Sequence, residues 1–245
     1  MTVPSLEVER RRLENGLEVV LHRDDRLPLV TVNLWYHVGS KNERPGRTGL
    51  AHLFEHMLFQ GSEHVSENGH FTHVQRVGGV ANGSTWYDRT NYYETLPSTQ
   101  LELGLWLESD RMGFLLPAMT AEKVENQRSV VMNERRQRVD NQPYGRAGER
   151  LNELLYPEGH PYHWPVIGYM DDIAAASLDD IRDFFRTWYA PDNAVLTLAG
   201  DIEPDAAFEL VERYFGPLPR GPKRPAPIAT GLPPERALQR EVLRD

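Results

Sequence analysis

A ten-residue apolar stretch, LAHLFEHMLF at residues 50–59, constrains this chain most, because it has to fold as a buried helix that nevertheless carries three polar side chains. Its apolar residues recur at helical spacing, and Gly61 supplies a C-terminal stop signal. His52 and His56 are four residues apart, and Glu55 follows the first histidine by three. A helix therefore projects all three polar side chains from one face.

Two imidazoles and a carboxylate on one helix face suit a metal site. Neutral imidazoles bind zinc well, and a carboxylate beside the ion can take a proton from water that the metal activates, so Glu55 is the natural general base. The alternative is a core helix with two satisfied histidines, but that helix would bury three costly polar groups together. Because the chain has no cysteine, histidine and carboxylate side chains have to hold any zinc.

A catalytic zinc site needs a third protein ligand, and the predicted helix around QRSVVMNERR offers one. Glu134 shares a helix face with Val131 and Gln127, and a carboxylate on an apolar face requires a cationic partner. The alternative partner is a neighbouring arginine such as Arg138, in an ordinary surface salt bridge. The apolar face favours Glu134 as the third ligand.

Strand and helix patterns mix along the chain without a regular βαβ rhythm. Residues 17–22 and 30–39 have the alternating, β-branched character of paired strands, and residues 78–97 predict two short strands around a turn at Asp88 and Arg89. This mixture favours an α+β fold, with a mostly antiparallel sheet packed against a layer of helices. A further buried strand is predicted at 193–201, and helices are predicted at 98–115 with Ser98 as cap, 120–139 with Thr120 as cap, 148–155, 177–188 with Ser177 and Asp180 as capping signal, and 204–215.

The C-terminal part of the chain differs in composition from the rest. Residues 216–236 contain seven prolines and few large apolar residues, which is typical of an extended linker. We therefore predict a compact zinc-binding domain at 1–215 and a proline-rich linker at 216–245.

Charge and hydropathy exclude several classes of partner. The formal net charge of -9 argues against a nucleic acid or an anionic membrane surface as partner. Residues 1–12 are charged and lack the apolar core of a signal peptide, and no stretch approaches the length of a membrane span, so we expect a soluble protein. Because a signal sequence can be removed by processing, cytoplasm and periplasm both stay open as compartments.

The sequence resembles the insulinase and pitrilysin-type zinc metallopeptidases, which carry an inverted HxxEH motif, and their processing-peptidase relatives. In that family the motif is followed about seventy-five residues later by a glutamate ligand in a V-V-x-x-E helix. His52, Glu55, His56 and Glu134 match this pattern. The resemblance covers essentially the whole chain and extends to VGSKNERPGRTGLAHLFEHMLFQGS, GGVANGSTWYDRTNYYETLP, GHPYHWPVIG, YAPDNAVLTLAGD and RYFGPLPRG.

The resemblance implies the N-terminal, zinc-binding peptidase half of a clamshell-shaped zinc endopeptidase, which cuts peptides held as an added strand. By the same resemblance, residues 81–85 form the edge strand that pairs with substrate. Asn82 then lies near the scissile carbonyl, and the alternative is an ordinary polar hairpin. The implied substrate contacts are Ala81, Asn82, Gly83 and Ser84.

Two features depart from the family pattern. Many relatives carry a second glutamate one heptad before the ligand glutamate, where this chain has Gln127, about 10 Å back along the helix. An amide at that position can hydrogen-bond a ligand or water but supplies no charge. Family peptidases also pair this half with a homologous second half, on the same chain or in a partner subunit. Since the chain stops at Asp245, we expect a fragment or a subunit completed by another chain.

Two other functions remain as alternatives. The same fold serves as a non-catalytic partner or scaffold subunit, although such members usually lose parts of the metal motif, which is complete here. A zinc hydrolase acting on bonds other than peptides would use the same metal and base. Only the family resemblance argues against the second alternative.

The remaining histidines fit no ligand pattern. His64, His70 and His73 follow the motif helix at spacings unsuited to a shared metal, and we expect them at the surface. His160 and His163 flank prolines in a loop, where a structural hydrogen-bonding role is expected.

Overall fold

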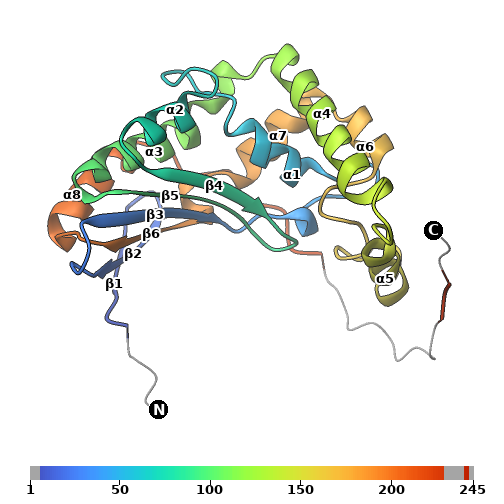
Figure 1. The fold of residues 1–245 in the computed structure, drawn as a ribbon, viewed down its shortest axis with the longest axis horizontal. Helices are drawn as coiled ribbons and strands as arrows, with labels where there is room; N and C mark the ends of the chain where they lie inside the picture. Colours follow the sequence, from blue (N-terminus) through green and yellow to red (C-terminus); the bar gives the residue numbers. More distant parts are fainter. Residues whose placement is uncertain (1–5, 229–239, 243–245) are drawn as a thin grey trace.

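The computed structural model describes residues 6–228 and 240–242. Its centre is a six-stranded sheet with the helices gathered on one side (Figure 1). The strands stand in the order β1-β2-β6-β3-β5-β4, and every neighbouring pair is antiparallel except β2 with β6. The predicted α+β fold with a mostly antiparallel sheet is therefore confirmed. The strands are β1 (Glu9–Arg12), β2 (Glu18–Arg23), β3 (Leu29–Tyr36), β4 (Val80–Thr85), β5 (Thr90–Pro97) and β6 (Ala194–Gly200).

Strand pairing differs from the sequence-based expectation at one place. β2 and β3 do not pair with each other, because β6 lies between them and pairs with both. Alternate residues of β6 are buried, so one face of this central strand packs into the core. The predicted hairpin of β4 and β5 is present, and the Trp86 N–H closes its turn by donating to the Arg89 carbonyl at 2.8 Å.

Helix starts follow the predicted caps with one exception. Thr120 caps α4, and Ser177 with Asp180 forms a capping box at α7. Ser98 caps nothing; its hydroxyl donates to Asp201 at 2.8 Å, and a 3-10 turn precedes α3. The helices are α1 (Leu50–Met57), α2 (Gly69–Arg76), α3 (Leu101–Ala118), α4 (Ala121–Arg135), α5 (Ala147–Leu155), α6 (Met170–Ala175), α7 (Leu178–Trp188) and α8 (Pro204–Phe215), with short turns η1 (Ser40–Asn42), η2 (Ser98–Gln100), η3 (Arg136–Asp140, π-helical) and η4 (Pro191–Asn193).

The core fills the space between the helices and the inner face of the sheet. Along β3, every second side chain is fully buried, ending with Tyr36, whose ring meets the buried Tyr92 of β5 edge-on at 6.1 Å. The sequence patterns did not predict α2, α6 or the short edge strand β1. Within the described part of the chain, every helix is too short or too polar to cross a bilayer.

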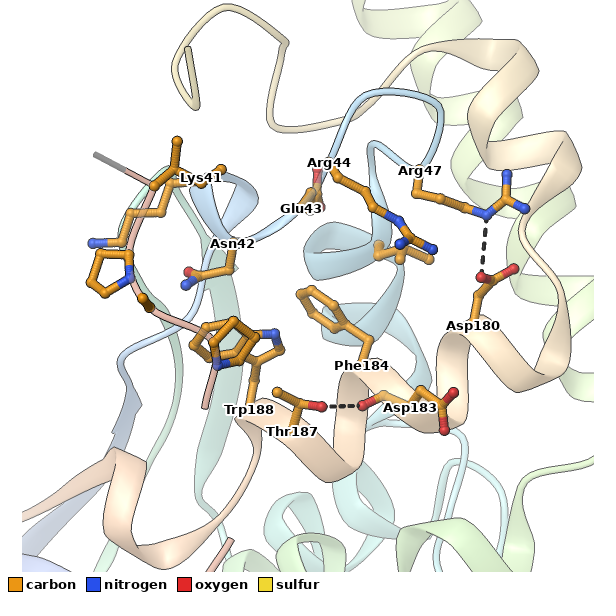
Figure 2. A pocket seen from close by; sticks show the side chains of 15 residues that line it. Lys41, Asn42, Glu43, Arg44, Arg47, Asp180, Asp183, Phe184, Thr187 and Trp188 are labelled. Carbon is orange, nitrogen blue, oxygen red and sulfur yellow. Dashed lines mark hydrogen bonds and ion pairs between the residues drawn. The ribbon is translucent and has the colours of Figure 1, made fainter. Parts of the chain in front are cut away.

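The first part of the predicted linker packs against the domain as a strap, residues 216–228. Leu218 is buried, and Asp192 holds the strap by accepting from the Gly221 N–H at 2.9 Å and pairing with Arg224 at 2.9 Å. Residues 225–228 then line a groove of about 420 Å³ beside α7 and η1, in which Trp188 forms one wall (Figure 2). The rest of the predicted linker lies outside the described residues, except for residues 240–242.

Candidate active site

The motif helix α1 has one buried and one polar face. The polar face carries His52, Glu55 and His56, which are only partly buried. On the other face, the ring of Phe54 stacks 5.7 Å from that of Phe184 on α7. Because this packing fixes the rotation of the helix, the three polar side chains are presented together, as the spacing predicts. The buried face is formed by Leu50, Leu53, Phe54 and Met57.

Glu134 reaches the two histidines from α4. Its Oε2 lies 3.2 Å from Nε2 of His56 and 3.7 Å from Nε2 of His52. Its other oxygen, Oε1, lies 2.6 Å from Nη1 of Arg138. The two partners considered for Glu134 are therefore not exclusive, since one oxygen faces the imidazoles and the other faces the arginine.

These three side chains fit a zinc ion. Their donor atoms lie within 4.8 Å of one another, and Oε2 of Glu134 is buried. Burial, together with the neighbouring His56, lowers the pKa of His52 to about 4, so this imidazole is neutral at neutral pH. The close approach of His56 lowers the pKa of Glu134, which keeps the carboxylate ionised. Two imidazoles and a carboxylate are a common protein set for catalytic zinc.

Glu55 lies between the candidate metal ligands and the edge of the sheet. A Cβ atom added to Gly83 of β4 would come within 3.3 Å of Cγ of Glu55, so the strand passes directly beside the Glu55 side chain. Burial raises the pKa of Glu55 above its ordinary value. The carboxyl group is thus held next to both an imidazole and a strand.

β4 is an edge strand, as expected from the sequence. The hydrogen bond that closes the turn sets the alternation of the ladder, so Asn82 and Ser84 face β5 with their backbone groups. Ala81 and Gly83 direct theirs toward the open edge. There the Gly83 N–H donates at 2.8 Å to Oδ1 of Asn82. Whether these four residues bind substrate stays a prediction.

Gln127 lies on α4, two turns before the candidate ligand, and is buried. Within the described residues, Nδ1 of His52 is buried without a hydrogen-bond partner, so the amide of Gln127 does not reach it in this structure. The supporting role expected for Gln127 stays a prediction.

Glu43 anchors the start of α1 and was missed by the sequence analysis. Its buried carboxylate accepts hydrogen bonds from the backbone N–H groups of Gly49 at 2.9 Å and Ala51 at 2.8 Å. These donors lack partners inside the helix, so the side chain of Glu43 satisfies them. Burial raises the pKa of Glu43 to about 8. The residue escaped notice because it reaches the helix from six positions before Gly49, outside any local capping pattern.

Arg135 holds α4 in place next to the candidate ligand. Its guanidinium is buried, pairs with both oxygens of Glu149 on α5 at 2.6 and 3.0 Å, and donates to the Gly168 carbonyl at 2.8 Å. Since Glu134 is the preceding residue, this fixed arginine sets the face that α4 turns toward α1.

Comparison with known proteins identifies the family. The sequence model of insulinase (peptidase family M16) matches residues 18–160, which include all four residues of the predicted site. The chain belongs to this family of peptidases. A second model, described as the peptidase M16 inactive domain, matches residues 175–245. The resemblance found in the motifs is thus confirmed.

Individual relatives of this M16 chain support a peptidase role. Zinc protease PqqE of Helicobacter pylori is 37% identical over 83% of this chain and 45% of that protein. Mitochondrial-processing peptidase subunit beta of Blastocladiella emersonii is 28% identical over 90% of this chain and 46% of that protein. A crystal structure of a protease from Helicobacter pylori superposes with a TM-score of 0.87 at 35% identity, over 91% of this chain and 53% of that one. The chain therefore spans about half the length of the curated relatives it matches.

A second group of titratable side chains lies in the core of this M16 domain. His64 is exposed as expected, but the expectation for His70 is wrong, because its ring is buried with Nε2 3.7 Å from Oε2 of Glu94. Glu108, which Arg111 pairs with at 2.8 Å, completes the group. With a neutral imidazole, two carboxylates and the guanidinium of Arg111, the group has a net charge of -1, which is costly when buried. One proton neutralises it, whereas a divalent metal ion would leave an equally large positive charge.

Glu94 is the site of that proton. Burial and the charge of Glu108 raise the pKa of Glu94 well above its usual range. The folded state therefore holds the proton more tightly than the unfolded state, whose carboxyl group titrates near about 4.3. Stability is fully present below that pH and is lost as pH rises through the folded-state pKa, with a slope of up to about 1.4 kcal/mol per pH unit.

We expect Glu94→Gln to remove this pH dependence, because glutamine keeps a hydrogen-bond donor and never carries a charge. Urea unfolding at pH 5 and pH 9 measures this dependence. From pH 5 to pH 9, the free energy of unfolding should fall less in the variant than in the wild type. Glu67→Gln, at an exposed carboxyl group, is the matched control and should behave as wild type. An identical fall in wild type and Glu94→Gln would contradict a proton on Glu94.

Proposed function

We propose that this chain is the zinc-holding half of an endopeptidase. The observation that carries the proposal is the convergence of two imidazole nitrogens and one carboxylate oxygen, from α1 and α4, beside Glu55 and an open sheet edge. Three protein ligands with room for water or substrate characterise catalytic rather than structural zinc sites. The names of several relatives as zinc proteases support zinc as the metal.

Each residue of the site has a distinct task in peptide hydrolysis. His52, His56 and Glu134 would hold zinc, which supplies Lewis acidity to polarise the scissile carbonyl and to acidify water. Glu55 accepts the proton from that water and can pass it to the leaving amine. Its partial burial favours both steps, because a raised pKa brings a carboxyl group closer to the pH at which it works.

Substrate binding would use the open edge of β4. An extended peptide can add to this edge as a further strand and exchange main-chain hydrogen bonds with Ala81 and Gly83. Oδ1 of Asn82 then has to leave the Gly83 N–H, and a substrate carbonyl takes its place. Since main-chain bonds are independent of side-chain identity, the edge accepts peptides of varied sequence.

The complete peptidase would contain a second, homologous half, on the same chain or in a partner subunit. Two facts support this: the chain covers about half of its relatives, and one relative is named as a subunit. Beyond the strap, Glu241 pairs with Arg150 of α5 at 2.8 Å.

The two alternative functions are less well supported. A non-catalytic partner subunit has no use for a complete set of ligands and base, and all four side chains are present and brought together here. A zinc hydrolase of other bonds would share the metal, but it would not need an edge strand beside the base. The names of the relatives also favour peptides.

The chain as purified should bind about one zinc ion through His52, His56 and Glu134, and metal analysis after mild chelator dialysis measures this. His52→Ala and Glu134→Gln should lose the ion, because each removes one of three ligands. His37→Ala, at an exposed histidine far from the motif in sequence, should keep it. Wild-type zinc content in both ligand variants would show that the metal is held elsewhere.

Glu55→Gln should leave zinc bound but abolish peptide cleavage by the complete enzyme, since the change preserves shape and removes proton transfer. Loss of a general base typically lowers the rate by about a hundredfold or more. Parallel measurements of metal content and of the cleavage rate separate binding from chemistry. More than about a tenth of the wild-type rate would remove Glu55 from the base role.

The isolated chain should fold and bind metal yet cleave peptides poorly, because a peptide on one open edge is loosely oriented. Lost positioning can raise the barrier by several kcal/mol. Cleavage of a long flexible peptide should be measured with the chain alone and then with the separately expressed second half added. A large gain on addition is expected. Full activity of the chain alone would make it a self-sufficient peptidase and would refute the need for a second half.

A further inference from the structure

The carboxylate of Glu134 divides its two oxygens between different groups. Oε2 faces the imidazoles of His52 and His56, at 3.7 and 3.2 Å from their Nε2 atoms. Oε1 lies 2.6 Å from the guanidinium of Arg138, one turn further along in η3. One oxygen is therefore engaged before any metal arrives, and only the other is left for a cation between the imidazoles.

We propose that Arg138 is a positioning residue that orients Glu134 for the metal, an inference that rests on the proposed zinc site. A carboxylate without a partner rotates about its last bond and presents either oxygen. A charge-assisted bond to one oxygen limits this rotation and directs the other oxygen toward the histidines. Binding then costs less conformational entropy, and supporting hydrogen bonds of this kind commonly strengthen metal binding.

No neighbouring arginine can take over this task. Arg135 is committed to Glu149 on α5, and Arg136 donates to the side chain of Asn133 at 2.7 Å. Within the described residues, Arg138 is therefore the only arginine that contacts the carboxylate of Glu134.

The positive charge of Arg138 also repels a bound cation. The balance between this repulsion and the orientation of Glu134 decides whether Arg138 strengthens or weakens zinc binding. The side chain of Arg138 is 77% exposed, whereas that of Glu134 is 16% exposed. Water screens the field of an exposed guanidinium at the distance of the ion more than it weakens a direct bond of 2.6 Å. Orientation therefore outweighs repulsion, and loss of Arg138 should weaken zinc binding.

The test is the zinc dissociation constant, measured on the chain itself by competition with a chromophoric chelator. Arg138→Ala should bind zinc about tenfold more weakly, at the lower end of the range for supporting residues because the arginine is exposed. Arg138→Lys, which keeps a cationic donor, should recover most of the loss. Arg136→Ala, an exposed arginine of the same turn, should bind as wild type. All three should unfold at the wild-type temperature.

Wild-type or tighter zinc binding by Arg138→Ala would overturn the proposal. An equal loss in Arg136→Ala would overturn it as well, because it would show an effect of general charge rather than of contact. His52→Ala, measured alongside, tests the zinc site itself. If that variant binds zinc as the wild type does, the proposed function fails. If it loses zinc and Arg138→Ala does not, only the role of Arg138 fails.

Discussion

The arrangement of the site depends on the burial of one face of α1. The helix has only two turns, and its apolar side holds Phe54 against the rings of Phe184, Phe185 and Tyr189. Burying each large apolar side chain contributes about 1.5–3 kcal/mol, so a helix rotated by one residue would lose several such contributions and bury charged groups instead. Hydrophobic packing thus decides where the polar trio points, although no apolar side chain takes part in the chemistry.

Buried carboxyl and guanidinium groups then fix the orientations of α1 and α4 more closely than apolar packing does. Glu43 holds the beginning of α1, and Arg135 ties the end of α4 to Glu149 on α5. The ion pair of Arg135 with Glu149 contributes little net stability, because desolvation offsets most of its attraction. Both contacts act mainly on orientation, since each has few satisfactory geometries. The start of α1 and the end of α4 are therefore each held by a contact with another segment of the chain.

The features that the sequence predicts are those that depend on residues close together in the chain. The trio on α1, the hairpin and the caps at Thr120 and Ser177 depend on neighbours within four residues or on short turns, so periodicity and spacing predict them. The place of β6 between β2 and β3 depends on pairing across more than 150 residues, which no local pattern encodes. Local patterns also do not show that His70 of α2 lies beside Glu94 of β5, or that Glu43 reaches the start of α1. Glu134 was predictable from two signals, a lone carboxylate on an apolar helix face and its spacing from the motif helix in the family pattern.

The hydrogen bond between the Gly83 N–H and Oδ1 of Asn82 bears on solubility as well as on substrate binding. An open strand edge recruits any extended segment, including the same edge of a second copy, and such pairing leads to aggregation. The side-chain amide of Asn82 occupies the outward-facing N–H of Gly83, and an incoming strand has to displace it. Pairing with the edge therefore costs the incoming strand one existing hydrogen bond. Under the proposed function, a peptide that the zinc site also holds brings further contacts that offset that loss. The edge would then favour substrate over a second copy without reading the substrate's sequence.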